Sequence, residues 1–190
     1  MKIFTTVSPK TIFNIYIVTD DKQKYGVIID PGDFSINIYN LVKYIGAKIT
    51  KVILTDGQNK KVEGIPTLKK VYDVDIYAYR NMVCDYETKV VRNGHEIVEG
   101  DLKFKIIETP APSYDSISIL IEDALFIGNV FQTGTLNRFK TEEFNTPDFE
   151  LKVIKKSILT LPEHTMIYPS FGPATTLEIE KKFNPYFKGI

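Results

Sequence analysis

Segment 55–64 gathers side chains that could do chemistry, because a carboxylate, a carboxamide and two ammonium groups fall within six residues. They are Asp56, Gln58, Lys60 and Lys61. The segment lies between a hydrophobic run, 52–54, and a helical pattern that starts near Val62. Two ammonium groups beside the start of a helix give a positive potential that suits a small anion. One of them can instead neutralise a carboxylate such as Asp56.

The chain offers few thiol and imidazole groups. The chain has one cysteine, Cys84, and two histidines, His95 and His164. A lone cysteine excludes an intramolecular disulfide and cysteine-rich metal sites, so we expect Cys84 to be a small filler packed behind a strand. His95 follows an Asn-Gly turn and His164 precedes a strand, so we expect both in surface loops rather than as ligands.

The composition limits the classes of function. The chain of 190 residues carries 24 basic and 24 acidic residues, with a net charge of zero. A nucleic-acid partner is therefore not expected. No stretch approaches the ~20 apolar residues of a membrane span, so we expect a soluble cytoplasmic protein without a membrane partner. No linker or repeat divides it, which predicts a single domain over residues 1–190.

The elements that must position these residues alternate between strand and helix in the first part of the chain. The β-branched runs 14–18 and 25–29 predict an antiparallel hairpin. Apolar residues then recur with helical spacing from Ile38 to Ile45, and Gly46 ends that pattern. Strand 52–54, a helix whose buried face holds Ile65, Leu68 and Tyr72, and strand 75–79 follow.

The later part is mostly strand and ends in helix. Runs 90–92 and 96–98 flank Asn93-Gly94, which predicts a hairpin. Further predicted strands are 102–107, 117–121 and 124–127. An apolar stripe predicts a helix after Thr146-Pro147, and it consists of Leu151, Ile154, Ile158 and Leu161. Thr175 with Glu178 predicts a capping box for a last helix that ends near Phe183. The pattern predicts an α/β fold with two mixed β-sheets in a four-layer α/β/β/α sandwich.

Segment 55–64 resembles the Thr-His-Gly-His-x-Asp-His-x-x-Gly signature of the metallo-β-lactamase-fold hydrolases. Other landmarks follow in the same order. Residues 29–33 resemble its Ile-Asp-Pro-Gly turn, and 109–116 resemble Thr-Pro-Gly-His-Thr-x-Gly-Ser. Residues 125–129 resemble Leu-Phe-x-Gly-Asp, and 168–176 resemble Tyr-Pro-Gly-His-Gly-Pro-x-Thr. The ending 180–187 is similar to the hydroxyacylglutathione-hydrolase-like branch. Arg138 resembles the arginine of a Gly-x-x-x-Arg stretch, and we expect it to tie loops together.

The resemblance implies a dinuclear zinc site, but the seven ligand positions hold other residues. They are Asp56, Gln58, Lys60, Lys61, Pro112, Asn129 and Phe171. Zinc needs about four N, O or S donors, mainly imidazole and carboxylate in this family. Only Asp56 still offers a charged donor, and an ammonium repels a dication. We therefore expect no zinc and no other cofactor, and a vestigial active-site cleft formed by these residues together with Asp115.

The two lysines allow more than one interpretation. They can be a solvated loop end with no role. Alternatively, at least one ammonium occupies the vacated metal position and pairs with Asp56 or Asp115, which would otherwise be buried unpaired. In a variant of this hypothesis, Lys60 and Lys61 make the cleft a site for a small anionic ligand.

Two classes of function follow. The first is a pseudoenzyme: a binding or structural domain that has lost its metals and its hydrolytic chemistry, and that acts through its cleft or as a homo-oligomer. The second is a hydrolase of the thioesterase or glyoxalase-like type. It would use either one metal held by Asp56, Gln58, Asn129 and Asp115, or a desolvated lysine of lowered pKa as a base.

Overall fold

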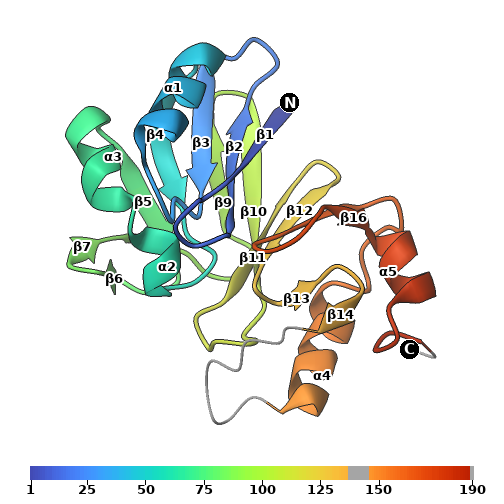
Figure 1. The fold of residues 1–190 in the computed structure, drawn as a ribbon. Coiled ribbons are helices and arrows are strands. Elements are labelled where there is room, and N and C mark those ends of the chain that lie inside the picture. Colours follow the sequence, from blue (N-terminus) through green and yellow to red (C-terminus); the bar gives the residue numbers. More distant parts are fainter. Residues whose placement is uncertain (137–145, 189–190) are drawn as a thin grey trace.

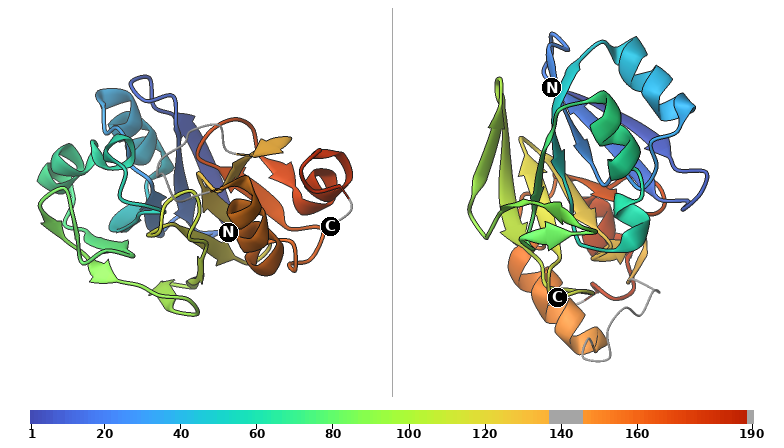
Figure 2. Two further views of the ribbon diagram at one scale, coloured as in Figure 1. Left: turned by 90° about the horizontal axis from the view of Figure 1, so that it is seen from below. Right: turned by 90° about the vertical axis from the view of Figure 1, so that its left-hand side faces the viewer.

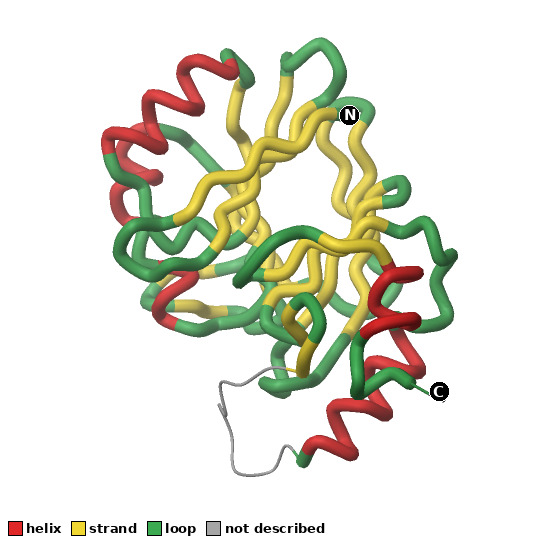
Figure 3. The backbone as a smooth tube through the Cα atoms, turned by 45° about the vertical axis from the view of Figure 1, so that its right-hand side comes forward, coloured by secondary structure: helices red, strands yellow, loops and turns green. Residues whose placement is uncertain are grey.

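Two six-stranded mixed sheets pack face to face, and helices cover both outer faces (Figure 1). The computed structural model describes residues 1–136 and 146–188. Arg138 lies outside the described residues. The tube in Figure 3 shows the helices gathered on opposite sides of the molecule, with the strands between them. The predicted α/β/β/α sandwich of two mixed sheets is confirmed.

The first sheet has the strand order β1-β2-β3-β4-β5-β8. Its strands are β1 Lys2–Val7, β2 Asn14–Thr19, β3 Tyr25–Ile29, β4 Lys48–Ile53, β5 Asp75–Ala78 and β8 Lys89–Val90. The first three strands are antiparallel, as the predicted hairpin requires, and β3, β4, β5 and β8 are parallel. Helices α1 Ile36–Ile45 and α3 Ile65–Val71 supply the crossovers that parallel strands need.

The second sheet has the order β16-β15-β12-β11-β10-β9. Its strands are β9 Glu96–Glu99, β10 Leu102–Glu108, β11 Ile117–Ile121, β12 Ala124–Gly128, β15 Met166–Pro169 and β16 Thr175–Thr176. Helices α4 Pro147–Ser157 and α5 Leu177–Phe183 lie on its outer side (Figure 2). Two small hairpins complete the fold: β6 Met82–Val83 with β7 Tyr86–Glu87, and β13 Phe131–Gln132 with β14 Thr135–Leu136.

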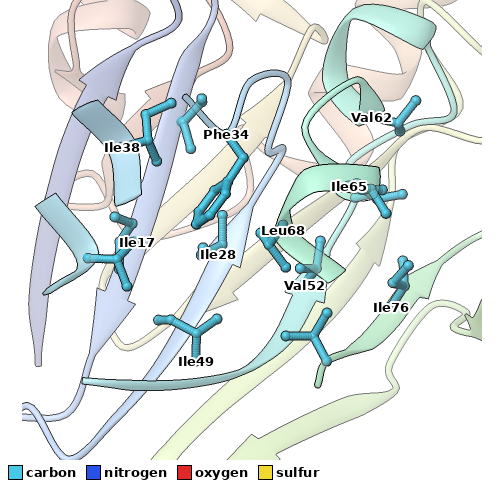
Figure 4. Packing of buried hydrophobic residues seen from close by; sticks show 14 of the residues in the cluster. Ile17, Ile28, Phe34, Ile38, Ile49, Val52, Val62, Ile65, Leu68 and Ile76 are labelled. Carbon is cyan, nitrogen blue, oxygen red and sulfur yellow. The ribbon is translucent and has the colours of Figure 1, made fainter. Parts of the chain in front are cut away.

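Three apolar layers hold the sandwich together. Figure 4 shows the first, where Ile38 of α1 and Leu68 of α3 meet Ile17, Ile28 and Val52 of the sheet. The second layer fills the space between the sheets, and the third lies between the second sheet and the two C-terminal helices. Burying each large aliphatic side chain contributes about 1.5–3 kcal/mol, which fixes the strand ends to which the site loops are attached.

The predicted hairpin at Asn93-Gly94 is wrong. The chain passes here from β8 in the first sheet to β9 in the second, so the flanking runs do not pair with each other. The Asn93 backbone N–H donates to the Glu108 carboxylate, and the Asn93 carboxamide oxygen accepts from the Glu108 backbone N–H. The hairpin that does form joins β9 to β10. Turn residues therefore marked a real turn, but the pairing was decided by the two sheets.

Two further predictions need correction. The cap of α5 is Thr176, whose hydroxyl accepts from the backbone N–H of Ile179, and Thr175 is a strand residue of β16. Cys84 is exposed rather than a packed filler, because it lies in the turn between β6 and β7.

The helical pattern predicted near Val62 begins earlier in the structure. A single turn, α2 Asn59–Val62, precedes α3, and it carries both lysines of the signature. The end of this turn is attached to the loop after β3, because the backbone N–H of Gly64 donates to the carbonyl of Pro31. The turn therefore has a fixed orientation, and Lys60 and Lys61 point to different environments. No helix within residues 1–136 and 146–188 is long and apolar enough to cross a membrane.

Candidate functional site

The ammonium of Lys61 lies at the centre of the site and is fully buried. Its Nζ donates to Oδ2 of Asp56 and to Oγ1 of Thr55, each at 2.6 Å. A second carboxylate, Oδ2 of Asp30, lies 3.4 Å away. Thr55 and Asp56 lie just beyond the end of β4, and Asp30 follows β3. Because the two strands are parallel neighbours, these residues lie at the same edge of the sheet.

Asp30 is the second anchor of this cluster. Its Oδ1 accepts from the backbone N–H of Thr55 at 2.8 Å, and its Oδ2 accepts from the Thr55 hydroxyl at 2.6 Å. The hydroxyl of Ser170, from the loop after β15 in the other sheet, donates to Oδ2 at 3.3 Å. Asp30, Lys61 and Thr55 therefore form a connected polar network that joins the two sheets beneath the loops.

The charges of this cluster support one another. Burial by itself lowers the pKa of Lys61, but the carboxylates of Asp30 and Asp56 outweigh it and raise that pKa above its usual value. Burial raises the pKa of Asp56, and the neighbouring charge of Lys61 opposes this effect only in part. Lys61 is therefore held as an ammonium ion.

Gly128 at the end of β12 leaves room for this ammonium. Its φ is +59°, a left-handed conformation that glycine adopts without strain. A Cβ at this position would lie 2.5 Å from Oγ1 of Thr55 and 3.2 Å from Nζ of Lys61. The close approach of the β12 backbone thus closes the pocket that surrounds Lys61.

Asp115 belongs to a different cluster. Its Oδ2 accepts from Nε of Arg80 at 2.5 Å and from the backbone N–H of Gly57 at 3.1 Å. Its Oδ1 accepts a short hydrogen bond from the hydroxyl of Ser113. The carboxylate is buried, whereas the side chain of Arg80 is 40% exposed. Asp115 therefore holds the signature loop against the loop after β10 and pairs with Arg80 rather than with a lysine of the signature.

The other expected site residues take different positions around the two clusters. Nδ2 of Asn129 donates to Oε1 of Gln58 at 3.1 Å, which links the two sheets across the site. Pro112 is buried and Phe171 is partly exposed. Lys60 is exposed, although it is adjacent to buried Lys61. The sequence therefore brought the right segments together but did not distinguish the two lysines.

A cleft of about 420 Å³ opens above these residues. Its lining consists of Gly57, Gln58, Asn59, Lys60, Arg80, Ser113 and Asp115. Lys61 is absent from the lining because it lies in the interior behind Asp56. The cleft is polar and has two cationic side chains on its walls, Lys60 and Arg80.

The residues described do not fit a dinuclear zinc site. No group of three or more His, Cys, Asp or Glu within 1–136 and 146–188 could hold a metal ion. Two carboxylates of the site, Asp30 and Asp56, both contact the ammonium of Lys61. An ammonium donates hydrogen bonds and has no lone pair to offer, so it excludes a dication from the position it fills.

The four ligands expected for a single metal are engaged by other groups of the protein. Asp56 is paired with Lys61, and Asp115 is paired with Arg80. The oxygen of Gln58 accepts from Asn129. The two charged donors are thus each neutralised by a cation of the protein, and the Gln58 oxygen is already engaged, which leaves this set poorly suited to a dication.

Sequence reasoning missed Asp30, Arg80 and Ser170. Asp30 lies in the Asp-Pro-Gly turn of the landmark 29–33, and its position as an acidic residue after a buried strand is a usable signal. Ser170 lies within the landmark 168–176, where attention fell on Phe171, and Arg80 lies in a loop without a recognisable pattern. His95 and His164 are both exposed, and neither lines the cleft, as expected.

Comparisons with known proteins agree with this fold. No known family model matches the chain. A protein of Bacillus subtilis named probable metallo-hydrolase YqgX is 26% identical over 93% of this chain and 93% of its own length. The hydroxyacylglutathione hydrolase of Wigglesworthia glossinidia brevipalpis is 27% identical over 77% of the chain, which spans 57% of that enzyme. The crystal structure of the BLEG-1 B3 metallo-beta-lactamase has a TM-score of 0.88 and 21% identity, with 99% of this chain and 100% of that chain covered.

Proposed function

We propose that this chain, a member of the metallo-β-lactamase superfamily, is a metal-independent binding or structural domain and not a metallohydrolase. The single observation that carries the proposal is the position of Lys61, whose ammonium lies 2.6 Å from the carboxylate of Asp56 and is fully buried. In this superfamily hydrolysis depends on a metal-bound water whose pKa is lowered to about 7. The ammonium cannot activate water in that way.

The energetics of the cluster support this proposal. Two buried carboxylates without a cation would be strongly unfavourable, and a buried charge needs a partner within hydrogen-bonding distance. Lys61 supplies this partner permanently because it is part of the chain. The scaffold can thus keep its folded structure without a metal, and its relatives' dependence on a metal does not carry over.

A lysine-based hydrolase is less well supported. A general base at neutral pH needs a pKa near 7, and the pKa of Lys61 is raised by Asp30 and Asp56. Lys61 also lies behind the wall of the cleft, out of reach of a substrate. The chemistry available in the cleft is therefore recognition of a ligand by Lys60, Arg80 and Ser113.

A hydrolysis assay tests the proposal. The names of the relatives suggest a hydroxyacylglutathione thioester as the probe, with the hydroxyacylglutathione hydrolase of Wigglesworthia glossinidia brevipalpis as the positive control. We expect no turnover above the uncatalysed rate, whether the chain is supplied with zinc, iron or manganese or treated with a chelator. Turnover that requires an added metal would contradict the proposal. So would turnover that persists with chelator and is lost in Lys60→Ala or Lys61→Ala protein that remains folded.

A further inference from the structure

We propose that the cleft beside Arg80, together with a second cleft that adjoins it, binds a small organic anion that carries a flat, unsaturated group. A phosphate or carboxylate would be held by Lys60, Arg80 and Arg92, and the flat group would pack against Tyr114. The inference rests on the proposed function in one respect, namely that the first cleft is a binding site and not a metal centre.

The two clefts share a wall. The first, of about 420 Å³, includes Lys60 and Arg80 in its lining. The second, of about 300 Å³, is lined by Tyr79, Arg80, Asn81, Met82, Val90, Arg92 and Tyr114. Arg80 therefore separates the two spaces and is accessible from both. A ligand of nucleotide size or smaller can place its charged end among these cations and its apolar part near the tyrosines.

The lining carries an excess of positive charge. Three cations face the two clefts, and Asp115 is the single carboxylate among the lining residues. Asp115 pairs with Arg80, whereas neither Lys60 nor Arg92 has an ion pair within the described part of the chain. The Arg92 guanidinium donates to the backbone carbonyls of Tyr79 and Val91, which hold it in place and leave its charge uncompensated. An anion gains from this local potential although the whole chain is neutral.

The aromatic groups hold the arginines ready for a ligand. The guanidinium of Arg92 lies 4.0 Å from the ring centre of Tyr79, and that of Arg80 lies 4.8 Å from the ring centre of Tyr114. The two rings meet edge to face with their centres 6.3 Å apart. Stacking restricts the rotamers of both arginines before binding. The two side chains therefore lose less conformational entropy when a ligand binds.

Tyr114 supplies the surface for a flat group. Its side chain is 54% exposed although Arg80 packs against the ring and Tyr79 contacts it edge-on. Nearby Met82 is also exposed, at 51%, and adds an apolar and adaptable contact in the same cleft. An exposed aromatic and an exposed methionine beside uncompensated cations favour an anion with a planar apolar part over a bare inorganic ion.

A titration followed by NMR tests this inference. The probes are phenyl phosphate and adenosine 5′-monophosphate, with methyl phosphate and adenosine as controls that lack the flat group or the charge. All titrations contain a chelator. We expect shifts at residues of both clefts, binding at least about fivefold tighter for phenyl phosphate than for methyl phosphate, and weaker binding at high salt.

Variants locate the site. Arg92→Gln and Lys60→Gln should each weaken phenyl phosphate binding by about tenfold, because each removes a charged partner of the phosphate. Lys103→Gln is the matched control, since Lys103 is an exposed lysine of β10 outside both clefts. It should leave the affinity unchanged. Tyr114→Ala should reduce the preference for phenyl phosphate over methyl phosphate while both still bind.

Absence of binding for every anionic probe at about 10 mM would overturn the inference, since a charged site of this kind should bind at millimolar concentration or below. So would equal weakening by Lys103→Gln, or equal affinity for adenosine and its monophosphate. These results leave the proposed function standing. Conversely, the protein could hydrolyse thioesters when metal is added and still bind the anions in the presence of chelator. That pair of results would overturn the proposed function and support the binding site alone.

Discussion

Nζ of Lys61 lies 2.6 Å from Oδ2 of Asp56, and both side chains are buried. The pair stands where the resemblance implies two histidine ligands of the dinuclear site. A metal site and this ion pair have the same electrostatic effect, because each neutralises carboxylates that are buried away from water. The difference is that the chain itself now carries the positive charge.

Replacement of Lys61 by methionine should destabilise the protein strongly. It removes the ammonium and leaves Asp30 and Asp56 without their cation, which costs roughly 3–5 kcal/mol. Urea unfolding measures this change. Lys60→Met is the matched control, since Lys60 is the exposed neighbour on the same helical turn, and we expect a change within about 0.5 kcal/mol. Similar losses in the two variants would contradict our assignment.

Alkaline pH should weaken the same interaction. The pKa of Lys61 is raised above its usual value of 10.5, so the folded state holds this proton more tightly than the unfolded state. The contribution to stability is complete below pH 10.5 and is lost as the pH rises through the higher pKa of the folded state. The difference in unfolding free energy between the natural chain and Lys61→Met should therefore shrink above pH 10.5. A difference that stays constant at high pH would show that Lys61 is not a buried ammonium.

Gly128→Ala should damage the site through packing. The new Cβ would meet the hydroxyl of Thr55 at 2.5 Å, in addition to the strain of a positive φ. We expect a loss of roughly 2–5 kcal/mol in unfolding free energy. Gly46→Ala provides the control, because Gly46 also has a positive φ, +78°, but its Cβ would meet nothing within 4 Å. That variant should lose about 1 kcal/mol; an equal loss in both would mean that the contact with Thr55 is not tight.

Restoring the ligands should restore metal binding if the scaffold has kept its geometry. A variant with histidine at 56, 58, 61, 112 and 171 and aspartate at 60 and 129 recreates the full signature. We expect about two zinc ions per chain, as in a dinuclear site. The same variant with Lys61 retained should bind at most one. A folded variant with all seven replacements that binds no zinc would show that the loops have moved away from the ancestral arrangement.

Much of the fold could be predicted from the sequence because its signals are local. The hairpin of β2 and β3, the amphipathic α1 with Gly46 at its end, and the stripe of α4 each follow from spacing within a single segment. The strand partner of β8 did not follow from Asn93-Gly94, because pairing depends on which sheet offers an edge. That choice is made by contacts between residues far apart in the chain.

The site could be predicted in part for the same reason. The landmarks identified the loops that meet, and the pairing of a lysine with Asp56 was one of the hypotheses. Which lysine is buried depends on the orientation of α2, and two adjacent residues of a helix point about 100° apart. The partner of Asp115 is Arg80, 35 residues away, and no local pattern links the two. Contacts of this length require the packed sheets.

The zinc content of the natural chain tests the central claim most directly. The protein is purified without chelator, dialysed against zinc, separated from free metal by gel filtration and analysed for metal by mass spectrometry. The account predicts less than about 0.2 zinc per chain, since the donors that zinc requires are replaced and an ammonium fills their place. About two zinc ions per chain, retained through gel filtration, would contradict it.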